Sequence, residues 1–298
     1  MRILLATDGS EYSTRAAAFL TRLNLSPEDE ISIFHALYWI PFLYDKEFYY
    51  DTLKEIKRDI APRIIDSALE VLKPVRAKIS AAIVEGPPEM CIVDASETFD
   101  ADLIAMGARG IRGLKSFFIG SVTREVSVRS PRPVLIVKRS AHKEAGRLKV
   151  LFASDGSDYS RATGEFLSRA PFHEDTEINI LNVMPPGALD IPETFAPEIT
   201  EGIVEVEEKI RKTRLAASER ILEEAGDLLR RRFANVRAFP EVGDASTEIL
   251  KAAERLKADL VAVGCRGLKG IKGMLGSVSR NVTAHAECSV LIGKLHGP

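Results

Sequence analysis

Residues 101–110 read Ala-Asp-Leu-Ile-Ala-Met-Gly-Ala-Arg-Gly, and residues 258–267 read Ala-Asp-Leu-Val-Ala-Val-Gly-Cys-Arg-Gly. In both stretches an apolar run typical of a buried strand ends in glycines and an arginine. Gly-Ser-Val follows each, at 120–122 and at 276–278. Glycines let the backbone approach an anion, and the free N–H groups at a helix N-terminus favour negative charge. Strand, loop and helix start therefore predict a phosphate-binding cradle, and the chain holds two of them.

The similarity between the two stretches extends along the whole chain. Ala-Thr-Asp-Gly-Ser at 6–10 returns as Ala-Ser-Asp-Gly-Ser at 153–157. The second copy has ten more residues between its second and third predicted strands, and one residue fewer in its glycine loop. The repeat is a domain duplication, because solenoid repeats are only about 20–50 residues long. We predict one domain at 1–140 and a second at 147–298, joined by a polar segment without apolar periodicity.

Composition and charge are those of an ordinary globular protein. The 298 residues are 45% hydrophobic and 28% charged, enough for two domains of ~150 residues with cores of their own. The net charge of −2 gives no electrostatic reason to expect a nucleic-acid partner. No apolar run reaches the ~18 residues of a membrane helix, so we expect no membrane contact. The N-terminus is predicted as a first strand rather than a signal peptide, and three cysteines without C-x-x-C spacing indicate the cytoplasm.

Apolar runs and helical periods alternate in each half of the chain. Strands are predicted at 2–6, 31–37, 77–84, 103–106 and 134–137, and again at 150–153, 178–183, 236–242, 260–263 and 290–292. Helices are predicted at 12–23, 53–72, 89–98 and 121–129, and again from 159 and at 198–232, 247–256 and 277–286, with a break at Pro62. This alternation predicts an α/β fold: two similar doubly wound domains, each a buried five-stranded parallel sheet flanked by helices.

Such sheets bind ligands beyond the carboxyl ends of their strands, which is where both glycine loops are expected. The chain has neither a G-x-x-x-x-G-K-[ST] loop nor a G-x-G-x-x-G after its first strand. It has Gly107-x2-Gly110-x9-Gly120-Ser121, after a first strand that ends in Asp-x-Ser and before a last strand Pro-Val-Leu-Ile-Val. This pattern resembles the ATP-binding motif of the universal stress protein family, G-x2-G-x9-G-[ST]. The resemblance covers both halves, so the chain is similar to a tandem universal stress protein.

The resemblance implies two sites for ATP, ADP or AMP, with Mg²⁺ accompanying the phosphates. The adenine ends would be formed by Thr7, Asp8 and Ala36 in the first half and by Ser154, Asp155 and Val183 in the second. Ribose and phosphates would be held by Gly107, Arg109, Gly110, Gly120, Ser121 and Val122, and by Gly264, Arg266, Gly267, Gly276, Ser277 and Val278. Arg112 and Lys115 would add positive charge. The second loop is one residue short of the family pattern, so we expect it to hold polyphosphate less tightly.

In the family, domains pair through their last strands. The resemblance therefore implies an internal pseudo-dimer in which residue 135 lies near residue 291, and pairing would cover an exposed strand edge. A homodimer of the whole chain and a protein partner remain open. The aromatic residues from Tyr38 to Tyr50 are interpreted as a loop packed on its own core, and the charges at 205–212 as a solvated helix face.

We interpret the chain as a nucleotide-binding regulatory or stress-response protein rather than an efficient enzyme, because the motifs supply a phosphate cradle and no general base. One alternative is a slow ATPase or autophosphorylating protein, with Ser121 as acceptor. Another is a scaffold or sensor whose second domain binds no nucleotide. Arg124 and Arg280 are interpreted as solvated, and His285 with Cys288 lacks the second ligand pair that a metal site needs.

Overall fold

The computed structural model describes residues 1–38, 47–110, 119–138, 147–187, 201–267 and 275–295. The first half contains β1 Arg2–Ala6, α1 Glu11–Leu20, β2 Glu30–Leu37, α2 Glu47–Leu72, β3 Lys78–Glu85, α3 Pro88–Thr98, β4 Leu103–Gly107, α4 Ser121–Arg129 and β5 Val134–Val137. The second half contains β6 Lys149–Ala153, α5 Asp158–Arg169, β7 Glu177–Met184, α6 Glu201–Arg230, β8 Asn235–Val242, α7 Ala245–Arg255, β9 Leu260–Gly264, α8 Ser277–His285 and β10 Ser289–Gly293. The predicted alternation of strands and helices is confirmed in both halves.

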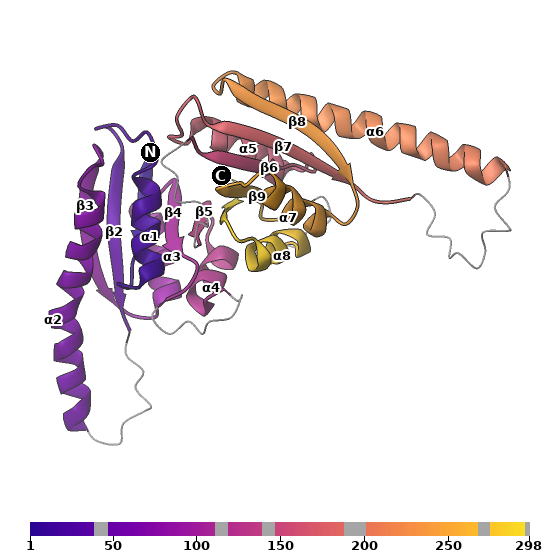
Figure 1. The fold of residues 1–298 in the computed structure, drawn as a ribbon. Coiled ribbons are helices and arrows are strands. Elements are labelled where there is room, and N and C mark those ends of the chain that lie inside the picture. The colour runs from indigo at the N-terminus through magenta and orange to yellow at the C-terminus, as the bar shows by residue number, and fades with distance from the viewer. Residues whose placement is uncertain (39–46, 111–118, 139–146, 188–200, 268–274, 296–298) are drawn as a thin grey trace.

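All ten strands form one sheet, in the order β3-β2-β1-β4-β5-β10-β9-β6-β7-β8. Every neighbouring pair is parallel except β5 and β10, which meet antiparallel at the centre, with Leu135 opposite Leu291. The two halves therefore pair through their last strands, and the predicted internal pseudo-dimer is confirmed. We call this β5–β10 junction the seam. Figure 1 shows the two halves on either side of it.

Helices cover both faces of the sheet, because alternate strand residues point to opposite faces. Ile3 and Leu5 of β1 pack with residues of α1, α2, α5 and α6 in one core. Leu4 of β1 packs with residues of α3, α4, α7 and α8 in the other. Each core runs across the seam, since each contains residues of both halves.

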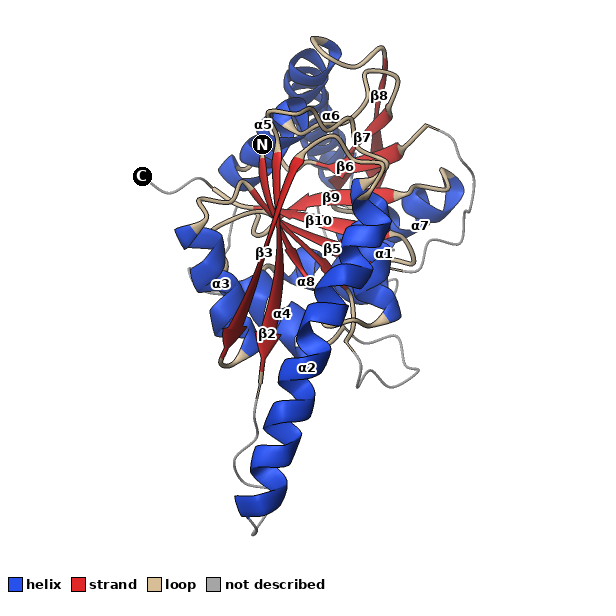
Figure 2. Ribbon diagram, turned by 90° about the vertical axis from the view of Figure 1, so that its left-hand side faces the viewer, coloured by secondary structure: helices blue, strands red, loops and turns tan. Residues whose placement is uncertain are grey.

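Two expectations about elements are corrected. Helix α2 is not broken at Pro62 but runs through it. A proline frees the carbonyl four residues earlier, here that of Arg58, and both residues are exposed, so water can bond that carbonyl. The edge strands β3 and β8 are also largely exposed rather than buried. Figure 2 shows α2 reaching well past the end of the sheet, and no described helix is long and apolar enough to cross a membrane.

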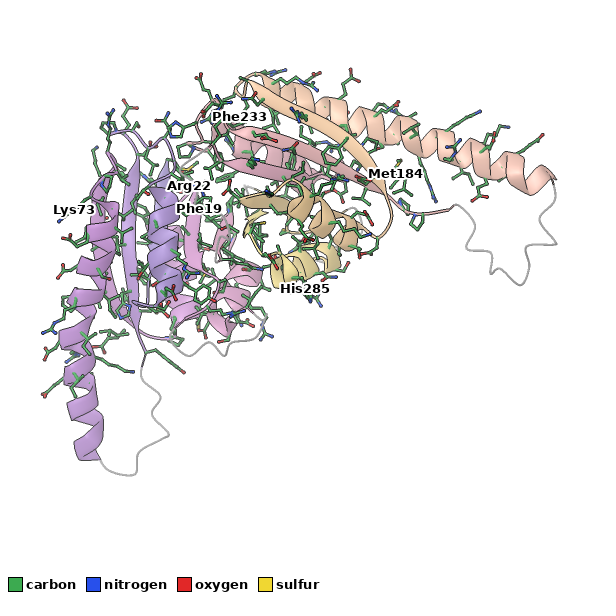
Figure 3. All side chains as sticks on the ribbon, viewed as in Figure 1. Phe19, Arg22, Lys73, Met184, Phe233 and His285 are labelled. Atoms are coloured by element: carbon green, nitrogen blue, oxygen red, sulfur yellow. The ribbon has the colours of Figure 1, made fainter. Side chains whose placement is uncertain are left out.

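The halves also meet at the amino-terminal edge of the sheet. Arg22, just beyond α1, donates to Asp259 Oδ1 of the second half at 3.1 Å, and Asn24 N–H donates to the Pro171 carbonyl at 2.7 Å. Asp259 Oδ2 also accepts from the Lys149 N–H at 2.9 Å. Figure 3 labels Arg22 beside Phe19, at the end of α1 nearest the second half. These contacts and the seam hold the halves together at separate places.

Candidate functional site

Asp8 lies in a tight turn between β1 and α1. Its Oδ1 atom accepts a hydrogen bond from the Ser10 N–H at 3.0 Å, and Gly9 between them has φ of +77°, which glycine adopts without strain. Ser10 caps α1, because its Oγ accepts from the Ser13 N–H at 3.3 Å. The Asp-x-Ser motif therefore fixes a carboxylate at the carboxyl end of the first strand.

Thr7 and Ser154 are the predicted site residues that directly precede Asp8 and Asp155, and a side chain from the second strand of each half contacts their carbonyl groups. His35 Nδ1 lies 2.8 Å from the Thr7 carbonyl oxygen, and Asn182 Nδ2 donates to the Ser154 carbonyl at 2.7 Å. Thr7 and Ser154 are buried. Each shares a hydroxyl–hydroxyl hydrogen bond with a serine of the following helix, at 3.1 Å and 3.2 Å. Their side chains are thus engaged inside the protein. Ala36 directly follows His35 in the second strand of the first half, and Val183 directly follows Asn182 in the second strand of the second half.

The glycine loop packs directly on this turn. A Cβ at Gly107 would lie 2.6 Å from the Tyr12 carbonyl carbon, and a Cβ at Gly110 would lie 2.4 Å from Asp8 Oδ2. A side chain at Gly107 would meet fixed backbone, so that position needs glycine, whereas a side chain at Gly110 would displace the Asp8 carboxylate. The Ser10 hydroxyl also donates to the Arg109 carbonyl at 3.4 Å. The structure therefore brings Asp8 and the loop from Gly107 to Gly110 together, although a hundred residues separate them.

Helix α4 begins where this loop returns to the sheet. Gly120 is its N-cap, and no side chain caps it. The Gly120 N–H donates to the Ala108 carbonyl at 2.9 Å, and the Thr123 hydroxyl to the Gly107 carbonyl at 2.9 Å. The first N–H groups of a helix lack partners within it, so this start offers hydrogen-bond donors and the positive end of the helix dipole to an anion. Ser121 is exposed there.

The second half repeats this geometry. A Cβ at Gly267 would lie 2.6 Å from Asp155 Oδ2, and the Gly276 N–H donates to the Cys265 carbonyl at 2.8 Å. Gly276 is the N-cap of α8, again without a side-chain cap. The two ends of the shorter loop are thus anchored as in the first half. The middle parts of both glycine loops, 111–118 and 268–274, lie outside the described residues. Arg112, Lys115 and the position that the second loop lacks all fall in these segments. The side chains from Trp39 to Tyr50 also lie outside the described residues.

A cavity of about 420 Å³ opens at this edge of the second half. This volume falls within the ~300–1,000 Å³ of typical small-molecule sites. The cavity is lined by all nine residues predicted for this half: Ser154, Asp155, Val183, Gly264, Arg266, Gly267, Gly276, Ser277 and Val278. The apolar part of its wall includes Leu181, Ile249 and Leu275. The carboxylate, the helix start and an apolar wall therefore face one space.

Sequence reasoning missed several residues of this wall. Ala245 and Ile249 of α7 line the cavity, and the position of their helix after the third strand, at the ligand-binding edge, was a usable signal. Arg280 is exposed as predicted, yet it also lines the cavity, with Nη2 donating to the Leu275 carbonyl at 3.2 Å. The solvated interpretation of Arg280 is therefore incomplete. Arg124 is exposed and contacts its neighbour Glu125.

The two loop arginines stack on tyrosines, which the sequence did not predict. Arg109 Nη1 donates to the Tyr12 hydroxyl at 3.3 Å, with the guanidinium carbon 5.5 Å from the ring centre. Arg266 does the same to Tyr159, at 2.5 Å and 5.2 Å. A guanidinium on an aromatic face keeps its charge and is restricted in orientation. Among the described residues, the two glycine loops included, no group of three or more His, Cys, Asp or Glu is arranged to hold a metal ion.

Comparison with known proteins gives a consistent result. The model of the universal stress protein family matches residues 1–138 and 146–294. A universal stress protein from Thermus aquaticus is 32% identical over 136 residues, covering 46% of this chain and 97% of that protein. One from Mycobacterium tuberculosis is 23% identical over 295 residues, covering 97% of this chain and 95% of its own. The crystal structure of a universal stress protein from Archaeoglobus fulgidus superposes with a TM-score of 0.63 at 23% identity, over 98% of this chain and 96% of that one.

Proposed function

Because the chain belongs to the universal stress protein family, we propose that each half binds one adenine nucleotide, ATP, ADP or AMP, at the carboxyl edge of its strands. The domains that carry these sites would span 1–140 and 147–298. The observation that carries the proposal is the second-half cavity, which joins a carboxylate, an apolar wall and an uncapped helix start in one space.

The chemistry of the lining matches the parts of a nucleotide. Asp155 and Val183 would face the adenosine, with Leu181 and Ile249 offering apolar surface to the base. The N–H groups of Ser277 and Val278, at the start of α8, would take the phosphates, with Arg266 and Arg280 supplying positive charge. Mg²⁺ would be held mainly by phosphate oxygens. In the first half Asp8, Ala36, Gly110 and Ser121 would take the corresponding roles.

We propose binding and signalling rather than fast turnover. Among the described residues that line the second-half cavity there is no histidine, lysine or second carboxylate to act as general base. All three cysteines are free thiols, which fits a role in the reducing cytoplasm.

The test begins with the purified protein. Denaturing it and identifying any released small molecule by mass spectrometry shows whether a nucleotide co-purifies. Protein freed of ligand should then show a higher melting temperature with ATP, ADP or AMP, since a ligand that binds only the folded state stabilises it. An unchanged melting curve at saturating concentrations of all three, with no nucleotide already bound, would contradict the proposal. Phosphate release above that of the Gly110→Val variant would indicate hydrolysis instead.

A further inference from the structure

Two lysines reach across the seam from the ends of its central strands. Lys138 follows β5, and its Nζ donates to the carbonyls of Ala286 and Ala284, at 2.5 Å and 3.5 Å. Lys294 follows β10, and its Nζ donates to the Ser127 carbonyl at 2.7 Å. Each lysine therefore bonds a residue of the opposite half.

The accepting carbonyls lie at the C-terminal ends of two helices. Ala284 and Ala286 are in the last turn and at the C-cap of α8, and Ser127 is in the last turn of α4. The last four carbonyls of a helix have no N–H partner within it, and this end carries the negative pole of the helix dipole. An ammonium group satisfies both needs, so each lysine caps a helix that belongs to the other half.

Placing two lysine ammonium groups in the seam costs the folded protein free energy. Burial in the seam lowers the pKa of Lys138 to about 8 and also lowers the pKa of Lys294. A lowered lysine pKa means that the folded protein disfavours the charged form, so holding these ammonium groups costs free energy. An apolar side chain of similar length would avoid that cost.

The capped helices are the two whose other ends form the candidate phosphate cradles. Helix α8 starts at Ser277 after Gly276, and α4 starts at Ser121 after Gly120. Each has nine residues, so about 13 Å separates the capped end from the cradle. A helix this short moves as a rigid body, and a shift at its C-terminal end therefore re-aims the N–H groups at its start.

We propose that Lys138 and Lys294 are positioning residues that act on the opposite half: Lys138 fixes α8 and the second phosphate cradle, and Lys294 fixes α4 and the first. The inference rests on the proposed function, because it assigns the cradles to phosphate.

The experiment separates the sites before testing the lysines. Gly110→Val leaves only the second site and Gly267→Val only the first, and ATP affinity is measured by calorimetry in each background. Lys138→Met should weaken the second site roughly fivefold or more, and Lys294→Met should weaken the first by a similar factor, as expected for a charge at a helix terminus. Lys138→Arg keeps a cationic donor and should restore much of the affinity. Lys73→Met is the matched control, since Lys73 is exposed and Figure 3 shows it on the outer side of the first half.

The crossed pattern decides the outcome. If Lys138→Met weakens the first site and spares the second, the lysine acts on its own half and the proposal is overturned. Unchanged affinities in both backgrounds overturn it as well. Hydrogen exchange without nucleotide keeps this test separate from the proposed function: faster exchange at the amides of α8 in Lys138→Met supports the proposal, and unchanged exchange overturns it. Failure of the wild-type protein to bind any adenine nucleotide would refute the proposed function alone.

Discussion

Replacing Gly110 by alanine tests how the glycine loop and the Asp8 turn fit together. The added Cβ would lie 2.4 Å from Asp8 Oδ2 and 3.6 Å from Asp8 Cγ, and among the described residues these are its only heavy-atom neighbours within 4 Å outside the adjacent residues. Within that part of the chain, the conflict is therefore with one short side chain and not with the backbone. The Asp8 carboxylate has to turn away, which breaks its hydrogen bond from the Ser10 N–H.

The magnitude follows from that bond. A hydrogen bond to a charged group contributes about 1.5–3 kcal/mol, and Asp8 is only partly buried, so we expect Gly110→Ala to cost about 1–2 kcal/mol of stability. If Asp8 orients the adenosine, ATP affinity at the first site should fall about tenfold as well. Urea denaturation and calorimetric titration measure the two effects.

A double-mutant cycle with Asp8→Ala checks the reasoning. Asp8→Ala removes both atoms that the new Cβ would meet, so Gly110→Ala should cost almost nothing in that background. The free-energy changes of the two substitutions should therefore fall short of additivity by about 1 kcal/mol or more. Strict additivity would show that Gly110 is required for a reason other than its contact with Asp8. Gly107→Ala is the contrast, because its Cβ would meet the backbone of Tyr12, and trimming a side chain cannot relieve that conflict.

Three further predictions concern the loops, the junction between the halves and pH. Gly110→Val should remove most of the ATP affinity and Gly267→Val less, because the eight-residue loop is expected to hold polyphosphate weakly; calorimetry that gives equal losses would contradict this. Arg22→Ala should destabilise the protein by about 1–3 kcal/mol in urea denaturation, because it leaves the buried Asp259 carboxylate without its cation. As the control, Arg161→Ala removes an exposed ion pair and should cost less than about 1 kcal/mol. Folding lowers the pKa of Lys138 from 10.5 to about 8, so above pH 8 the unfolded chain binds more protons and this lysine makes stability rise with pH. The free energy of unfolding should rise by about 1 kcal/mol between pH 8 and 9, and this rise should be absent in Lys138→Met. Burial raises the pKa of Cys288 to about 11, so above pH 9 the unfolded chain loses the thiol proton first and the stability contributed by this cysteine falls.

The sequence alone was sufficient for the features that depend on local backbone preferences. Alternating apolar runs and helical periods define the ten strands and the helices between them, because each period follows from the geometry of one element. Gly107 and Gly264 were identifiable as positions where a side chain would meet the backbone of the helix that follows the first strand of each half, and Gly110 and Gly267 as positions where it would meet the Asp8 or Asp155 carboxylate. Even the pairing of Leu135 with Leu291 could be expected, since the family resemblance implied it and a bare last strand leaves hydrogen bonds unsatisfied.

Only the tertiary structure decided which distant side chains meet. Nothing local to Arg109 predicts that it stacks on Tyr12. The position of α7 after the third strand places Ile249 at the ligand-binding edge, but only the structure shows that it lines one cavity with Asp155. The sequence around Lys138 shows a cation after an apolar strand, which would ordinarily be solvated. It lies instead against the end of α8, because antiparallel pairing at the seam carries the end of each last strand to the helix of the other half. Such contacts depend on the orientation of whole elements, which no sequence period encodes.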